Sequence, residues 1–206
     1  MRIIKQIMGL SLLAFVLAFF ALWVSKQFMT EETDQQTKDL VAVHGAGHKQ
    51  WRELSSKDHN FCILLPGYPQ HVTYSVPTPS EKGPIKYETY VTQEKEGTTF
   101  MLSIIEYPHP LTEGQKEGLL LEVQGEYQKG NVQNELAYSE QGLFDGFPSI
   151  DFLLSGKKIS IRARGVVVGS KLYILTLIDH SIQDVEDHFR RYASTFQLKK
   201  EERMPR

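Results

Sequence analysis

The chain has 206 residues, a formal net charge of −2 and a single cysteine, Cys62. This length suits one domain of about 150 residues plus an extra segment, since such a domain already buries roughly 70% of the surface that its unfolded chain exposes. The charge argues against nucleic acid as a partner, because that binding needs a basic surface. One cysteine excludes an internal disulfide, and the apolar run around Cys62 predicts a small core residue.

The first 29 residues have the properties of a membrane anchor. No charged residue lies between Lys5 and Lys26, and a helix of that length rises about 30 Å, the thickness of the hydrocarbon core of a bilayer. The apolar run at 7–24 is longer than that of a cleaved signal, and its end has bulky side chains where signal peptidase requires small ones. We therefore predict a retained helix that contacts the membrane through residues 7–24. Cleavage near Ser25, which would leave a secreted or periplasmic domain, is the alternative.

Charges on the two sides of this segment predict its orientation. Arg2 and Lys5 precede it, whereas Lys26 is followed by Glu31 and Glu32. Lys and Arg are enriched on the cytoplasmic side of membrane spans. The N-terminus is therefore expected in the cytoplasm and the rest of the chain outside a bacterial-type cytoplasmic membrane.

Residues 30–50 are mostly polar and are predicted to be a linker, whose reach as a flexible coil would be roughly 25 Å. His44 and His48 are four residues apart, which on a helix would place both rings on one face for a metal ion. Gly45 and Gly47 argue against a helix at this point. We therefore predict no metal site here.

Residues 51–199 are predicted to form the domain, with a polar tail at 200–206. Turn residues separate several neighbouring strand patterns, so hairpins should predominate. Both faces of 171–178 are apolar, which predicts a central strand, whereas 158–168 alternates apolar with polar residues, which predicts one dry and one wet face. The expected strands lie at 51–54, 61–65, 71–76, 85–92, 99–107, 133–141, 149–154, 158–168 and 171–178.

Two helices are expected between and after these strands. Thr112 and Gln115 have the spacing of a capping box, which predicts a helix over 112–129. Ser181 can cap a last helix that ends near Phe196. The order of elements, with hairpins rather than crossovers, predicts an α+β fold in which helices pack on a mostly antiparallel sheet.

Several short stretches resemble those of exported bacterial domains related to the PsbP-like α/β/α sandwich. These stretches are Ser55–Asp58, Leu64–Pro69, Lys171–Leu175 and Ala193–Phe196. The known members of that wider fold are accessory binding proteins, including an extrinsic photosystem subunit and a Ran-binding import factor. The resemblance thus implies a binding or assembly module, although a fold does not fix a function.

No catalytic, cofactor or metal motif is apparent in the sequence. Arg162 and Arg164 should project from the same strand face about 7 Å apart, where they could bind an anionic ligand or an acidic partner. Tyr107 and His109 form a polar, aromatic edge that could contact a partner. These four residues are the candidate binding residues, and we predict no catalytic residue, metal or cofactor.

A second pair of residues invites acid–base chemistry. Asp179 and His180 are adjacent, but neighbouring residues on a strand point to opposite faces, and no nucleophile motif accompanies them. The leading hypothesis is a membrane-tethered accessory or interaction module with a protein partner in the envelope. The alternatives are an extracytoplasmic hydrolase and a small-ligand carrier, which a deep pocket would favour, whereas an exposed apolar patch would favour partner docking.

Overall fold

The computed structural model describes residues 51–56, 58–78, 83–94, 97–130, 133–180 and 185–199. The predicted anchor, linker and tail lie outside these ranges, as does Ser181. No helix in the described ranges is long and apolar enough to cross a membrane.

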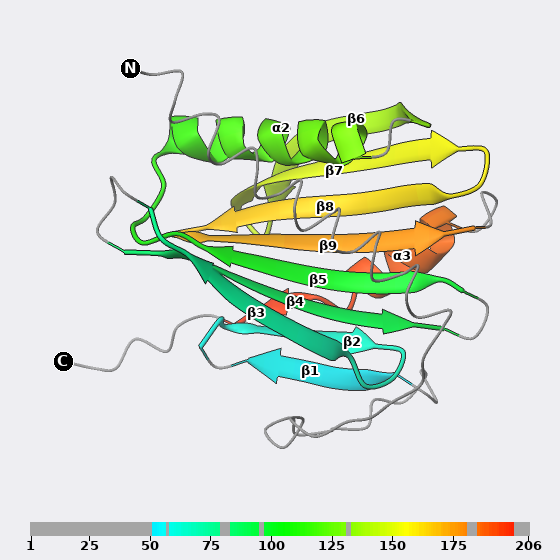
Figure 1. Ribbon diagram of the computed structural model, residues 1–206, viewed down its shortest axis with the longest axis horizontal. Coiled ribbons are helices and arrows are strands. Elements are labelled where there is room, and N and C mark those ends of the chain that lie inside the picture. The colour runs from blue at the N-terminus through cyan, green and yellow to red at the C-terminus, as the bar shows by residue number, and fades with distance from the viewer. Residues whose placement is uncertain are drawn as a thin grey trace.

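A seven-stranded sheet forms the centre of the domain (Figure 1). Its order is β3-β4-β5-β9-β8-β7-β6, and every neighbouring pair is antiparallel, as the hairpin patterns predicted. Helix α2 (Glu113–Gly130) connects β5 to β6, so it joins two meanders. The strands are β3 (Gln70–Val76), β4 (Ile85–Gln93), β5 (Thr99–Glu106), β6 (Asn134–Phe144), β7 (Phe147–Gly156), β8 (Ser160–Val168) and β9 (Lys171–Asp179).

Strand β9 is the fourth of the seven strands and is buried on both faces, which confirms the prediction of a central strand. The start of α2 also agrees with its capping signal, since the backbone N–H of Thr112 donates to Oε1 of Gln115 at 2.9 Å. Such a bond satisfies one of the backbone donors that a helix start leaves open.

The predicted opening hairpin is confirmed, but it belongs to a second, smaller sheet. In this sheet β2 (Phe61–Leu65) lies between β1 (Arg52–Ser56) and β10 (Gln197–Leu198). The sequence did not predict β10, because a strand of two residues has no periodicity to detect.

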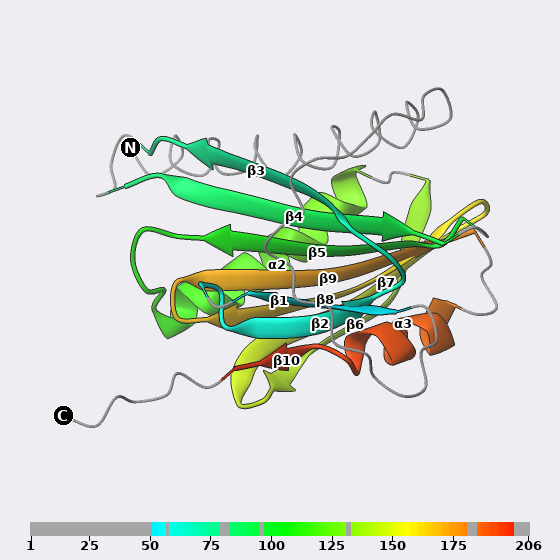
Figure 2. The same cartoon turned by 90° about the horizontal axis from the view of Figure 1, so that it is seen from below.

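Two apolar cores lie on opposite faces of the large sheet. Figure 2 shows α2 behind this sheet and strands β1 and β2 in front of it. Helix α2 packs on β6, β7 and β8 on one face. The small sheet and helix α3 (Val185–Ala193) pack on the other face. Val185, Phe189 and Tyr192 are the buried stripe of α3, at the three- and four-residue steps of an amphipathic helix. The described chain is therefore an α/β/α sandwich with an added small sheet.

Two tight turns lie at the same end of the large sheet. Asp145 and Gly146 join β6 to β7 with φ angles of 51° and 84°. Asp-Gly favours this turn because both central residues need positive φ. Gly169, with φ of 60°, begins the turn between β8 and β9.

The prediction of a wet face on the strand at 158–168 is wrong. Ser160 is fully buried and Arg162 is only 6% exposed, because α3 packs over this face of β8. The alternation of side-chain types on β8 is real, but both faces are covered. Cys62, expected in the core, is only half-buried.

Candidate functional site

A cleft of about 820 Å³ opens where the turns of the large sheet meet the small sheet. This volume falls within the roughly 300–1,000 Å³ of typical small-molecule sites. The residues come from the β1–β2 turn, the β6–β7 turn, the β8–β9 turn and the end of β10. They are Asn60, Asp145, Phe147, Val168, Gly169, Ser170, Lys171, Tyr173, Leu198 and Lys199.

The inner wall of the cleft is apolar. Tyr173 is 2% exposed, and its hydroxyl donates to the backbone carbonyl of His59 at 2.6 Å. This bond fixes the ring. Burial, with a smaller effect of the negative charge of Glu106, raises the pKa of Tyr173 to about 12. Phe147, Val168 and Leu198 are half-buried beside it. The wall therefore presents an apolar surface to whatever enters the cleft.

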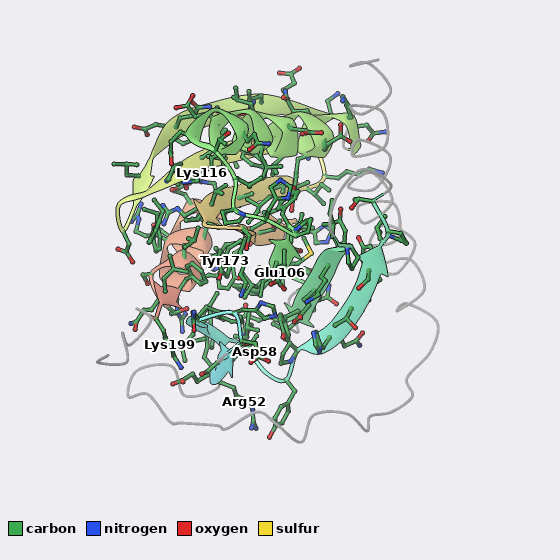
Figure 3. All side chains as sticks on the ribbon, turned by 90° about the vertical axis from the view of Figure 1, so that its left-hand side faces the viewer. Arg52, Asp58, Glu106, Lys116, Tyr173 and Lys199 are labelled. Atoms are coloured by element: carbon green, nitrogen blue, oxygen red, sulfur yellow. The ribbon has the colours of Figure 1, made fainter. Side chains whose placement is uncertain are left out.

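Lys171 and Lys199 are the two lysines among the lining residues. Figure 3 labels Lys199, together with Tyr173 of the inner wall. Nζ of Lys171 donates to the backbone carbonyl of Asp58 at 2.6 Å, and Nζ of Lys199 donates to Oγ of Ser55 at 2.7 Å. Within the described part of the chain, neither lysine has a carboxylate at ion-pair distance. Asp145 supplies the carboxylate among the lining residues and is exposed.

The loop between β5 and α2 forms hydrogen bonds with the β8–β9 turn, which lines one wall of the cleft. The backbone N–H of Tyr107 donates to the carbonyl of Ser170 at 2.8 Å, and that of Leu111 donates to the carbonyl of Gly169 at 3.1 Å. The predicted binding residue Tyr107 is half-buried against the α2 core, and His109 is exposed on the same loop. Tyr107 therefore supports the turn that lines the cleft.

Arg162 and Arg164 project from the same face of β8, as predicted, and this is the face on which α3 packs. Arg162 forms ion pairs with Asp151 at 3.2 Å and with Glu186 of α3 at 2.9 Å, and its guanidinium lies 4.8 Å from the ring centre of Phe189. Arg164 forms an ion pair with the same Asp151 at 3.0 Å. Both guanidinium groups therefore already have partners within the domain.

The four predicted binding residues do not form one site. The arginines lie on the α3 face of the large sheet, whereas Tyr107 packs against the α2 core on the other face. Arg162 connects a strand to a helix, and its burial suits a structural role. Arg164, with 26% of its side chain exposed, is the more accessible of the two.

A second polar cluster joins the β1–β2 turn to β3 and β4. Nε2 of the buried His59 lies 2.8 Å from Glu88, and His71 stacks on the ring of Tyr90 with 4.2 Å between ring centres. Burial by itself would raise the pKa of Glu88, but the hydrogen bond and charge of His59, with smaller effects of Tyr90 and His71, outweigh it and lower the pKa. Since every member has a partner in the cluster, we interpret it as a link between the two sheets.

The predicted neighbours Asp179 and His180 do not form a pair in the described structure. Instead, the buried carboxylate of Asp179 lies 2.9 Å from Nδ1 of His188 on α3 and accepts a hydrogen bond from Thr98 at 3.3 Å. No cluster of three or more His, Cys, Asp or Glu side chains in the described ranges has the geometry of a metal site. The arrangement positions α3 against the end of β9.

Strand β6 forms an open edge of the large sheet and carries three of the six large apolar side chains that are exposed in the described part of the chain. Its only strand neighbour among the described residues is β7, and Leu143 is 73% exposed. Leu136 and Leu143 lie on the same side of the sheet as α2, which carries the exposed Leu121, while Tyr138 lies on the α3 side over Arg162. We call these four residues the β6 edge surface: Leu121, Leu136, Tyr138 and Leu143.

No family model and no curated protein matches the chain. Among solved structures, the chain is similar to the solution structure of cyanobacterial PsbP from Synechocystis sp. PCC 6803, with a TM-score of 0.50 and 16% sequence identity, over 77% of this chain and 98% of that one. It also matches a protein of unknown function from Pseudomonas aeruginosa, with a TM-score of 0.38 and 10% identity, over 76% of this chain and 98% of that one. The chain therefore has a PsbP-like fold.

Proposed function

We propose that the chain is an accessory module that binds a protein partner near the outer face of a bacterial cytoplasmic membrane, to which residues 7–24 anchor it. The β6 edge surface is the observation that carries this proposal. Three large apolar side chains are exposed along this one strand, Leu136 and Leu143 on the α2 side and Tyr138 on the α3 side. Exposed apolar surface on a folded domain can mark an interaction site. An open strand edge offers unpaired backbone donors and acceptors to an extended partner segment.

The edge of β6 has few of the features that normally prevent strand pairing. Edge strands are commonly protected by lysine, proline or a bulge, and β6 contains neither lysine nor proline. Its bulge lies between Leu136 and Tyr138, which leaves Tyr138–Phe144 as a regular segment of seven residues. The opposite edge strand, β3, has one large exposed apolar residue, Val72, at 41%.

A photocrosslinking amino acid at Leu143 should yield a specific adduct with an envelope protein when the full-length, membrane-anchored chain is expressed in its own cells. The same amino acid at Val72, on the opposite edge, is the matched control and should not yield that adduct. A Leu136→Glu substitution should reduce the adduct from position 143 at least tenfold, because a partner segment that pairs along β6 would contact both side chains. Recovery of only the monomer, or equal adducts from both edges, would contradict the proposal.

The anchor is tested separately. We expect the chain purified from membranes to resist alkaline carbonate extraction and to retain the peptide that contains Trp23, measured by mass spectrometry of its N-terminus. An N-terminus near Ser25, together with a soluble chain, would show that the segment is a cleaved signal. The partner proposal would survive that result, since the β6 edge surface does not depend on the anchor.

The cleft favours small-ligand carriage as a second candidate function. Its volume and its mixture of apolar and charged residues are those of a ligand site. For the alternative of a hydrolase, the structure supplies an oriented Asp179–His188 pair, but within the described ranges no hydrogen bond connects His188 to a nucleophile.

A further inference from the structure

We infer that the cleft binds a small organic anion with an apolar portion. This inference is independent of the proposed partner, because the cleft and the β6 edge surface share no residue. It is carried by the distribution of charge and apolar surface among four segments that the fold brings to one place.

The charge comes from Lys171 and Lys199. Each makes its described hydrogen bond to a neutral oxygen, so neither ammonium group is neutralised by a carboxylate in the described part of the chain. An ammonium group can donate three hydrogen bonds. Each lysine therefore has donors left for an anionic group, and a hydrogen bond between charged partners is roughly twice as strong as one between neutral groups.

The apolar part of the ligand would contact the wall formed by Phe147, Val168 and Tyr173. The hydroxyl of Tyr173 is already bonded to the carbonyl of His59, so this residue offers mainly its ring. An inorganic anion would leave this wall unused. A purely apolar molecule would leave two charges without a counterion.

Asp145 gives the inference a second, independent test. Its carboxylate is the acidic group among the lining residues and has no ion-pair partner in the described ranges. It should repel a bound anion, so its removal should strengthen binding. Asn suits the backbone at this position, where φ is 51°, because Asn adopts the left-handed region more readily than most residues do.

The experiment uses the full chain in nanodiscs of zwitterionic phosphatidylcholine with hexanoate as the probe. Binding is measured by the protection of lysine amines from acetylation, quantified by mass spectrometry. Hexanoate should protect Lys199 and Lys171 but not Lys158, an exposed lysine at the opposite end of β8. Lys171→Gln should raise the half-protecting concentration about tenfold, Asp145→Asn should lower it severalfold, and Lys158→Gln should leave it unchanged.

Hexanol and acetate test whether both the charge and the apolar chain of hexanoate are needed, and phosphatidylglycerol tests whether the bound anion is a lipid headgroup. Hexanol should not protect either lysine, and acetate should protect them only at much higher concentration. Protection by hexanol equal to that by hexanoate, or protection of Lys158, would overturn the inference, as would no protection at all. If nanodiscs that contain phosphatidylglycerol protect the two lysines without hexanoate, the bound anion is a lipid headgroup. That result would overturn the inference of a soluble ligand.

Discussion

Replacing Arg162 by Met should lower the free energy of unfolding by about 3 kcal/mol, the lower end of the range for breaking a buried ion pair. Arg162 is 6% exposed and connects Asp151 on β7 to Glu186 on α3. The loss stays near the lower end because Arg164 still neutralises Asp151, and because half of the Glu186 side chain is exposed. Urea unfolding of the full chain in detergent, followed by tryptophan fluorescence, measures this change.

Arg164→Met is the matched control on the same face of the same strand. Its side chain is 26% exposed, and its partner Asp151 would keep Arg162, so we expect a loss of about 1 kcal/mol or less. Equal losses for the two variants would show that Arg162 is not the main connection between α3 and the sheet. A loss of stability in Arg164→Met but not in Arg162→Met would show that Arg164, and not Arg162, makes the more important ion pair.

Replacing Phe61 by Ala should cost about 3–5 kcal/mol, the usual penalty for removing a buried aromatic ring. Phe61 is fully buried, and its ring lies 6.3 to 6.4 Å from the rings of Tyr90, Tyr173 and Phe196. Phe61 therefore packs the small sheet against the large one. The same urea titration measures the loss.

The neighbouring residue provides the control for Phe61. Cys62 lies on the other face of β2 and is half-buried, so Cys62→Ala should change the free energy of unfolding by only about 0.5 kcal/mol. Phe61→Ala should also weaken hexanoate protection of Lys199, because Tyr173 at the base of the cleft packs on Phe61. A stability loss as small as that of Cys62→Ala would contradict the role assigned to this ring.

Hairpins and the central strand could be predicted because their signals are local. Asp145-Gly146 is a turn signal that needs only its flanking strands, and the apolar residues on both faces of β9 indicate a strand with cover on both sides. The burial of Arg162 could not be predicted in this way. Its cover comes from α3, which lies more than twenty residues later in the chain, and its partner Glu186 is visible only once that helix is placed.

The cleft could not be predicted from the sequence either. Asn60, Asp145, Lys171 and Lys199 come from four turns or strand ends that are far apart in the chain. No spacing connects them, because only the pairing of β10 with β2 and the antiparallel order of the large sheet bring them to one end. That neither lysine has a carboxylate at ion-pair distance in the described part of the chain is recognisable only in three dimensions.

The pairing of β10 with β2 means that the small sheet cannot be completed until the end of the domain has been synthesised. Lys199, next to the last strand, donates its backbone N–H to the carbonyl of Asn60, and the hydroxyl oxygen of Thr195 accepts a hydrogen bond from the backbone N–H of Leu64. A chain that emerges from its N-terminus first therefore presents β1 and β2 long before their closing partner exists. Completion of the small sheet must wait for the final residues of the domain, so truncation at this end would remove a strand on which the earliest-made hairpin depends.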